Sequence, residues 1–334
     1  MNDHEHTIEL LRTGEKRREE RRRFMRTAAS ATIAAGGLSL LAACSGDDNN
    51  STPTPSPTPT PTPTGATGTV SDADIFNFAL NLEYLESQFY LMAVYGSGLS
   101  PANLGGTGTQ GTVTGGRKVT FTDPVVAQYA REIAADEAAH VNFLRATLGT
   151  AAIAQPAINI DGGATGAFTA AARAAGLIGA NDTFDPYASD ENFLLAAFIF
   201  EDVGVTAYKG AAPLIANKTY LEAAAGILAA EAYHAGLLRT ALYSKGLQTP
   251  SLRTSADKIS DARDSLDGSI DDDQGITGDA TTSNIVPADS NGIAYSRTTG
   301  QVLNIVYLSK SSLAAGGFFP AGVNGNIRTS AASG

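Results

Sequence analysis

Two short motifs in this chain combine a carboxylate and an imidazole at a spacing of about one helical turn. Glu137 is followed three residues later by His140, and Glu231 by His234. Residues three apart lie on the same face of a helix, so each pair would offer an oxygen and a nitrogen to one metal ion. The chain has four histidines, and the other two lie in the N-terminal tail. Both histidines beyond that tail therefore close a Glu-x-x-His motif, which indicates metal binding.

Two more glutamates stand in the middle of strongly apolar helical stretches. Glu83 lies within Asp72–Tyr95, and Glu201 follows a second apolar run. A buried carboxylate needs a partner, which is either a metal or a basic side chain. A tyrosine follows each glutamate seven residues later, about two turns along the same face: Tyr90 and Tyr208. These tyrosines are expected in the core, with hydrogen bonding to a ligand or a redox role as the alternative.

Together these motifs supply four carboxylates and two imidazoles. Two divalent ions would balance the four negative charges, which removes the main objection to burying four acids. Oxygen-rich ligands with one histidine per metal favour iron or manganese over zinc or copper(I). The predicted ligands of two such ions are Glu83, Glu137, His140, Glu201, Glu231 and His234. Glu86, one turn from Glu83, is left open as a ligand, as an acid beside the ligands or as a solvated residue.

The first 44 residues are typical of an export signal. Arg21 and Arg22 open a stretch that resembles a twin-arginine signal, and Ala28–Ala43 is an apolar run too short for the roughly 20 residues that span a bilayer. The run ends in Leu-Ala-Ala-Cys, which resembles a bacterial lipobox, so Cys44 is expected to become the first mature residue and to carry lipid. The alternative is a plain export signal with an incidental cysteine. Cys44 is the only cysteine, which excludes an intramolecular disulfide and a multi-thiolate metal site.

Residues 45–70 are rich in Pro and Thr, which favours an extended polyproline II segment of about 3.1 Å per residue. We expect a semi-rigid stalk that holds the following domain off a membrane. The formal net charge of −11 makes the chain a poor candidate for binding nucleic acid. These features predict an exported protein, lipid-anchored to the cell envelope and facing the periplasm or the exterior. The oligomeric state is left open, a homo-oligomer included.

Start and stop signals predict four long helices within residues 71–250. Asp123 suits an N-cap and Pro124 the first helical position, and the motif Thr219-x-x-Glu222 is typical of a capping box. The Gly- and Thr-rich residues 99–118 are expected to form a loop. The predicted long helices are Asp72–Tyr95, Pro124–Leu148, about 190–212 and about 220–245, and a short Ala-rich helix is expected at about 167–177.

Residues 251–334 are expected to form an extension that packs on the helices. Thr298 and Gln301 suit a capping box for a short fifth helix, Thr299–Leu308, and two phenylalanines, Phe318 and Phe319, are expected to anchor an irregular tail. The acidic stretch Asp264–Asp273 has the composition of a surface loop. It lacks the spacing of an EF-hand, so a solvated loop is the preferred interpretation.

Residues 72–246 resemble the ferritin-like superfamily and, within it, a bacterial ferritin-like domain family related to plant desiccation-related proteins. Asn81-Leu82-Glu83 with Tyr90 is similar to the first-helix pattern of ferritins, and Asp136–His140 to the Asp-Glu-x-x-His motif of di-iron carboxylate proteins. Arg297–Leu303 and Gly316–Pro320 resemble the C-terminal region of this family. The resemblance implies an all-α fold: a four-helix bundle with a short fifth helix and an irregular C-terminal region.

The resemblance also implies roles for individual residues. In di-iron carboxylate proteins the aspartate of the motif orients the metal-bound histidine of the opposite motif, which implies that Asp136 orients His234. The chain departs at the matching place, because Ala230 precedes Glu231 and leaves His140 without an equivalent partner. The two metals are therefore expected to be unequal.

The implied substrate of such a centre is O2 or H2O2. The implied activity is ferroxidase-like oxidation of Fe²⁺ or catalase-like disproportionation of H2O2 with manganese, and the ligands alone do not separate the two. The alternative is a structural or stress protein of the envelope, related to desiccation proteins, without redox turnover. A closed iron-storage cage is disfavoured by the anchor, the stalk and the long loops.

Overall fold

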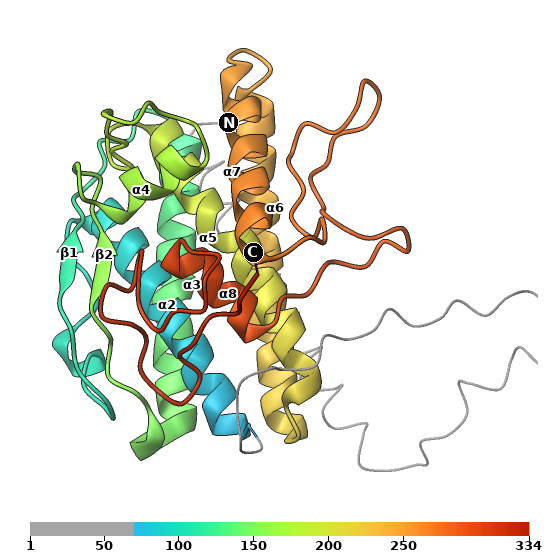
Figure 1. Ribbon diagram of the computed structural model, residues 1–334. Coiled ribbons are helices and arrows are strands. Elements are labelled where there is room, and N and C mark those ends of the chain that lie inside the picture. Colours follow the sequence, from blue (N-terminus) through green and yellow to red (C-terminus); the bar gives the residue numbers. More distant parts are fainter. Residues whose placement is uncertain (1–69, 334) are drawn as a thin grey trace, which may run out of the picture. The chain divides into compact units, whose positions relative to one another are not determined.

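Four long helices carry the glutamates and histidines singled out above. They are α2 (Asp72–Tyr95), α3 (Pro124–Leu148), α5 (Asp190–Ala211) and α6 (Lys218–Lys245). Figure 1 shows them side by side in a computed structural model, which describes residues 70–333. The all-α bundle expected from the sequence is confirmed. The predicted export signal, with Arg21, Arg22 and Cys44, and the Pro/Thr-rich linker up to residue 69 lie outside the described residues.

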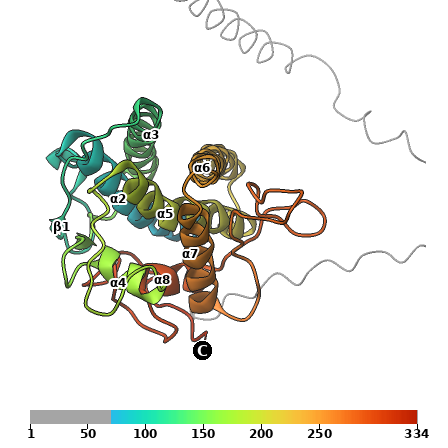
Figure 2. The same ribbon diagram turned by 90° about the horizontal axis from the view of Figure 1, so that it is seen from above.

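The helices form layers, with α2 and α5 in the middle. Seen from above, α3 and α6 lie on one side of this pair, and α4 (Ala167–Ala174) and α8 (Thr299–Tyr307) lie on the other (Figure 2). Because α2 and α5 are covered on both sides, they are buried around most of their circumference, whereas α3 and α6 bury one stripe each. The glutamates of α2 and α5 therefore lie in the interior, where their charge must be compensated.

Local capping interactions begin the long helices. The Ser71 side chain accepts a hydrogen bond from the Asp74 amide, and the Asp123 side chain accepts from Val125 and Val126 ahead of Pro124, as predicted for the second helix. The predicted capping box at Thr219 and Glu222 is wrong. Asn217 caps α6 instead, because its side chain already accepts hydrogen bonds from the free amides of residues 219 and 220.

The connections contain more regular structure than their composition suggests. The stretch expected as a loop, residues 99–118, includes a 3-10 turn, Pro101–Asn103, and strand β1, Val113–Gly115. β1 pairs in parallel with β2 (Ile158–Ile160), with Val113 opposite Ile158. Both isoleucines of β2 are fully buried, so this small sheet adds to the core beside α2 and α4.

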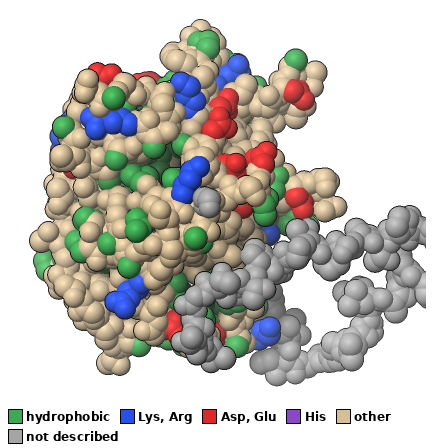
Figure 3. Space-filling model, viewed as in Figure 1, with side chains coloured by type: hydrophobic (Ala, Val, Ile, Leu, Met, Phe, Trp, Pro, Cys, Tyr) green, Lys and Arg blue, Asp and Glu red, His purple; other side chains and the backbone are tan. Residues whose placement is uncertain are grey.

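The C-terminal region confirms part of the prediction and corrects another part. The capping box of Thr298 and Gln301 begins α8, and Phe318 and Phe319 are fully buried. A further helix, α7 (Ser251–Asp267), was not predicted, and it takes up the first part of the supposed surface loop Asp264–Asp273. Acidic side chains do gather over α7 and the loops beside it on the face shown in Figure 3. Three acids of this stretch are nevertheless buried: Asp267, Asp272 and Asp273.

Within residues 70–333, no helix combines the length and the apolar character that crossing a membrane requires.

Candidate metal centre

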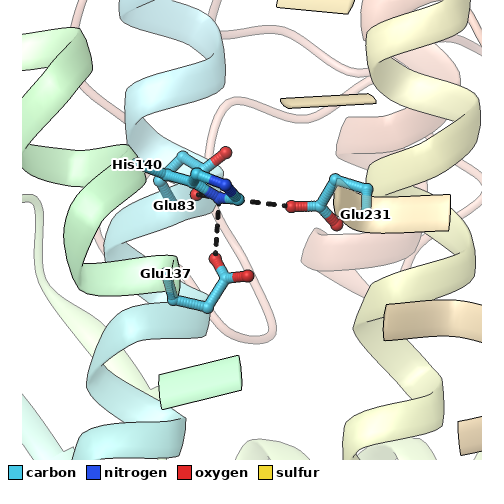
Figure 4. A group of neighbouring side chains, drawn as sticks. All are labelled: Glu83, Glu137, His140 and Glu231. Carbon is cyan, nitrogen blue, oxygen red and sulfur yellow. Dashed lines mark hydrogen bonds and ion pairs between the residues drawn. The ribbon is translucent and has the colours of Figure 1, made fainter. Parts of the chain in front are cut away.

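The predicted ligands meet in the middle of the bundle, one glutamate from each long helix. The carboxylates of Glu83, Glu137, Glu201 and Glu231 are fully buried, and the side chains of His140 and His234 are 12% and 5% exposed. Figure 4 shows residues of α2, α3 and α6 pointing toward one another across the interior. The structure thus brings together all six residues that the sequence singled out.

These residues form two groups that share members. In the first, His140 Nδ1 lies 3.2 Å from Glu83 Oε2 and 3.7 Å from oxygens of Glu137 and Glu231. The second group adds Glu201 and His234 to the same two glutamates, and within each group the ligand atoms lie within 4.8 Å of one another. Glu137 and Glu231 belong to both groups. The arrangement therefore has two adjacent positions for a cation, each with one histidine, and two carboxylates placed to bridge them.

Unsatisfied polar atoms test whether cations fit this place. Six buried atoms of the cluster have no hydrogen-bond partner in the described part of the chain: both carboxylate oxygens of Glu137 and of Glu231, Oε2 of Glu201 and Nδ1 of His234. Leaving a buried polar atom unsatisfied costs about 1–3 kcal/mol. Among residues 70–333, no lysine or arginine lies within ion-pair distance of these carboxylates. Metal ions would satisfy all six atoms, so the donor set fits metal binding.

The charges of the cluster couple the two histidines to the glutamates. Burial opposes ionisation of Glu137, yet the neighbouring rings of His140 and His234 lower its pKa to about 2. Burial likewise opposes a charge on His140, but Glu83 and Glu137 raise its pKa to about 10. Burial raises the pKa of Glu231, and the charge of Glu137 raises it further. Without metal, the protonated histidines therefore act as the counter-ions of the acids.

Two tyrosines connect the halves of the cluster. Tyr90 of α2 donates a hydrogen bond of 2.5 Å to Glu201 Oε1 on α5, and Tyr208 of α5 donates one of 2.5 Å to Glu83 Oε1 on α2. Both tyrosines are buried. They lie in the core, as expected, and they also hold the carboxylates of two predicted ligands, which was the stated alternative.

A family model described as a ferritin-like domain matches residues 71–244, which span all four helices of the cluster. The chain belongs to the ferritin-like domain family. It is 28% identical over 273 residues to the ferritin-like catalase Nec2 of Nesocodon mauritianus, with 77% of this chain and 85% of that protein covered. It is 27% identical over 248 residues to the desiccation-related protein PCC13-62 of Craterostigma plantagineum, with 70% of this chain and 76% of that protein covered. No solved structure gives a significant match.

The ferritin-like centre is asymmetric at its edge. His234 Nε2 lies 3.2 Å from Asp136 Oδ2, while its Nδ1 faces Glu137 Oε1 at 3.2 Å, so Asp136 is placed to orient the ring. At the matching position of the other motif stands Ala230. Within residues 70–333, no carboxylate lies within ion-pair distance of Nε2 of His140. The two histidines therefore differ in support and in exposure.

Gly204 is part of this ferritin-like centre, and the sequence analysis missed it. A Cβ atom at this position of α5 would lie 2.4 Å from Glu231 Oε2 and 3.6 Å from Glu86 Oε1. Any larger residue would displace the Glu231 carboxylate. The sequence does hold one signal for this residue, a glycine in the interior of an apolar helix. Such a glycine destabilises the helix by about 1 kcal/mol relative to alanine, which indicates that close packing requires it. Glu86 itself is buried, which excludes the solvated alternative.

A second cluster of buried charges lies beside the ferritin-like centre, and we name it the arginine network. Its cations and anions are Arg239, Arg263, Arg297, Asp202, Asp267, Asp272 and Asp273, all of them buried. Arg297 Nε lies 2.5 Å from Asp267 Oδ2, and Arg239 Nη1 lies 2.6 Å from Asp202 Oδ2.

Two acids of the arginine network, Asp267 and Asp272, form a group with metal-like spacing together with Asp264. Asp264, Asp267 and Asp272 offer oxygens within 4.8 Å of one another. Arg297 already donates to two of these three carboxylates, at 2.5 Å to Asp267 and 3.4 Å to Asp272. The guanidinium therefore supplies the positive charge here. The network also ties the C-terminal region to α5, because Arg263 of α7 pairs with Asp202 at 2.9 Å and Arg297 donates to Thr206 at 2.9 Å.

Proposed function

We propose that this chain binds two manganese or iron ions at the ferritin-like centre and decomposes hydrogen peroxide there. The observation that carries the proposal is the pair of four-residue groups that share Glu137 and Glu231. The similarity to a ferritin-like catalase over 77% of the chain favours H2O2 as the substrate. Ferroxidase-like oxidation of Fe²⁺ by O2 is the competing chemistry, and it would use the same ligands.

Each of the two four-residue groups would hold one ion. Glu83, Glu137, His140 and Glu231 would hold one ion, and Glu137, Glu201, Glu231 and His234 the other. Two redox-active ions held there would supply the two-electron chemistry for disproportionation, 2 H2O2 → 2 H2O + O2.

The residues around the ligands keep the centre in shape. Asp136 accepts a hydrogen bond from Nε2–H of His234 and so fixes Nδ1 as the ligand atom. Tyr90 and Tyr208 donate to Glu201 and Glu83, which leaves the other oxygen of each carboxylate for a metal. Full burial of the four carboxylates excludes bulk water and strengthens each of these interactions.

The proposal places the centre outside the cytoplasm. The twin-arginine-like stretch at Arg21 and Arg22, the lipobox-like sequence at Cys44 and the Pro/Thr-rich stalk support a protein anchored to the envelope by lipid. Replacing Cys44 with Ser should move the protein from the membrane fraction to the soluble fraction. Retention of the Cys44→Ser protein in membranes would contradict the anchor.

A structural role is the second candidate. The similarity to a desiccation-related protein over 70% of the chain favours it. In this case the metal would serve as a staple that satisfies the six unpaired atoms of the cluster and stabilises the fold. Removing the metal would then lower the melting temperature, and no H2O2 would be consumed in either state.

The deciding experiment measures metal and turnover on one sample. Protein from its own envelope fraction is analysed for Fe and Mn, and O2 release from H2O2 is followed with an electrode. We expect about two ions per chain with turnover, and neither in the double variant His140→Ala/His234→Ala. Glu222→Ala is the matched control, because Glu222 is exposed on α6 away from the cluster. Full metal content in the double variant would refute the site, and folded native protein with neither metal nor turnover would refute the function.

A further inference from the structure

The end of α7 gathers negative charge where a helix favours positive charge. Asp264 and Asp267 lie in the last turn of α7, which has no basic residue, and Gly268 follows as the C-cap. The C-terminal end of a helix carries a partial negative charge, so cations stabilise it and acids do not. The helices α3, α5 and α6 each place a basic residue in the last turn. The end of α7 lacks this local cation and carries two acids instead.

A third carboxylate joins these two aspartates from the turn that follows the helix. Asp264, Asp267 and Asp272 offer oxygens that lie within 4.8 Å of one another. Two oxygens that bind one calcium ion at about 2.3–2.6 Å lie at most about 4.6–5.2 Å apart, so one ion can contact all three side chains. A donor set of oxygen alone suits calcium, magnesium or manganese rather than zinc or copper. The group therefore has the spacing and the chemistry of a site for a hard cation.

Each carboxylate of this group uses one oxygen within the protein. Oδ1 of Asp264 accepts a hydrogen bond from the amide of Asp272. Arg297 donates to Oδ2 of Asp267 and to Oδ1 of Asp272. The second oxygen of Asp267 is the informative one, because this side chain is 1% exposed and its Oδ1 has no hydrogen-bond partner among residues 70–333. Burial of such an atom is unfavourable unless a donor or a cation satisfies it, so Oδ1 of Asp267 indicates a ligand.

Arg297 balances only part of the negative charge around this group. The arginine network and Asp264 together contain five aspartates and three arginines, which leaves two negative charges when all eight groups are ionised. Among residues 70–333, no basic side chain lies within ion-pair distance of Asp264. One divalent cation would make the whole cluster neutral. Asp264 is partly exposed, so an ion can reach the group from solvent and keep water among its ligands.

We propose that Asp264, Asp267 and Asp272 bind one calcium ion at the end of α7, separate from the ferritin-like centre. The ion joins the last turn of α7 to the turn after it. Arg297 contacts two of the three carboxylates, so the ion also supports the segment that leads into α8. The two sites differ in their donors, since this group offers oxygen alone and the centre offers oxygen together with imidazole. The inference goes beyond the proposed function and does not depend on it.

Two aspartates of α7 provide a matched test. Asp264 belongs to the group, whereas Asp261 is exposed one turn earlier on the same helix and lies outside it. Asp264→Asn removes the charge and keeps an oxygen that accepts from the amide of Asp272. Asp261→Asn removes the same charge at the surface. Asp272→Asn removes another ligand of the group and replaces Asp264→Asn if that variant does not fold.

The probe is calcium chloride, titrated into the full chain in a calorimeter after treatment with a chelator. Wild type and Asp261→Asn should bind one Ca²⁺ with a dissociation constant of about 10⁻⁴–10⁻³ M, and Asp264→Asn should bind at least about tenfold more weakly. In about 10 mM Ca²⁺ the melting temperature of wild type and of Asp261→Asn should rise by about 3–10 °C, and that of Asp264→Asn should rise less. Equal calcium binding by the two Asn variants, or no binding by wild type, overturns the inference.

Two further measurements assign the ion to this site. The double variant His140→Ala/His234→Ala should bind Ca²⁺ as wild type does, because the ferritin-like centre is not involved. Loss of calcium binding in the double variant would place the ion in the centre and overturn the inference. Mg²⁺ should bind more weakly than Ca²⁺, because it requires near-octahedral geometry and gives up its water reluctantly. Tighter binding of Mg²⁺ would overturn the choice of calcium.

Discussion

Glu201 and Asp202 are neighbours on α5, yet they belong to two clusters of buried acids that differ in their counter-ions. Asp202 Oδ2 lies 2.6 Å from Arg239 and 2.9 Å from Arg263, inside the arginine network. Among residues 70–333, Glu201 has one oxygen without a hydrogen-bond partner, and the only basic group within ion-pair distance of it is His234, at 3.4 Å. One helix thus places two adjacent carboxylates in the interior, one beside arginines and the other beside a histidine.

The difference separates a structural cluster from a chemical one. A guanidinium keeps its charge at every physiological pH and is fixed to the chain, so the arginine network has a permanent counter-charge. The proposed metal centre would rely on charges that exchange, because its histidines would bind either protons or a metal. A cluster that must release and rebind its counter-ion is suited to chemistry, and a cluster with fixed counter-ions is suited to holding the C-terminal region on α5.

The largest expected effect is the pH dependence of metal affinity at the centre. Burial disfavours the charged form of His140 and of His234, but the neighbouring glutamates raise their pKa values to about 10 and about 12. Both rings therefore hold a proton at pH 6–8 without metal, and both must release it to bind. Loading should weaken as the pH falls, by at least about ten-thousandfold from pH 8 to pH 6. Competition with a chelator measures this, and a pH-independent affinity would contradict the exchange of protons for metal.

Removal of Arg297 should cause the largest loss of stability. Arg297→Met leaves Asp267 and Asp273 buried without this counter-ion, which should lower the free energy of unfolding by about 3–5 kcal/mol. Arg117→Met is the matched control, since Arg117 pairs with Asp185 at the same 2.5 Å but at the surface, and its loss should cost less than about 1 kcal/mol. Urea unfolding measures the free energy of unfolding of both variants. Equal losses would show that burial does not make the Arg297–Asp267 pair more important for stability than the exposed Arg117–Asp185 pair.

Neutralising one acid in each cluster should give different results in the metal-free protein. Asp273→Asn weakens hydrogen bonds from Arg263 and Arg297 and should cost about 1.5–3 kcal/mol. Glu231→Gln should leave stability unchanged within about 0.5 kcal/mol, because burial and nearby acids raise the pKa of Glu231 and so favour the neutral form, which glutamine resembles. Glu231→Gln should nevertheless abolish the stabilisation that added metal gives to wild type. A destabilised Glu231→Gln protein would mean that the acids of the centre are compensated without metal.

The smallest expected effect concerns the tyrosines. Tyr90→Phe removes the hydrogen bond to Glu201 and should cost about 1 kcal/mol of stability together with a loss of metal affinity. Tyr187→Phe is the control, because Tyr187 is also buried but donates to the backbone oxygen of Ile160. Both variants should lose similar stability in thermal unfolding, and only Tyr90→Phe should bind metal more weakly. Unchanged metal affinity in Tyr90→Phe would limit that tyrosine to packing.

The parts of the fold that follow from local chemistry were predictable from the sequence. The bounds of α2 and α3 agree with the prediction because caps such as Asp123 and the apolar pattern are encoded within a few residues. The six residues of the cluster were singled out because Glu-x-x-His places both groups on one helix face, and because Glu83 and Glu201 stand within apolar helical stretches. Gly204 was missed because its importance depends on Glu231, which lies on another helix and reaches it only in the fold.

The arginine network was not predictable for the same reason. Asp267 lies 30 residues before Arg297, and Asp202 lies 61 residues before Arg263, so neither pairing leaves a local pattern. The composition of Asp264–Asp273 favours a solvated loop when its partners are unknown. Burial of these acids follows only from arginines that reach them in the fold, Arg263 and Arg297.

The crossed hydrogen bonds of Tyr90 and Tyr208 have a consequence for how the chain could be divided. The α2–α3 pair and the α5–α6 pair each resemble one half of a two-fold dimer, and neither pair alone contains a complete ligand group. A break between α3 and α5 would yield two fragments, each with three of the four residues of one cation site and one residue of the other. Metal ions would then act as the joint that brings the fragments together, so reassembly of a split chain would itself report on loading of the centre.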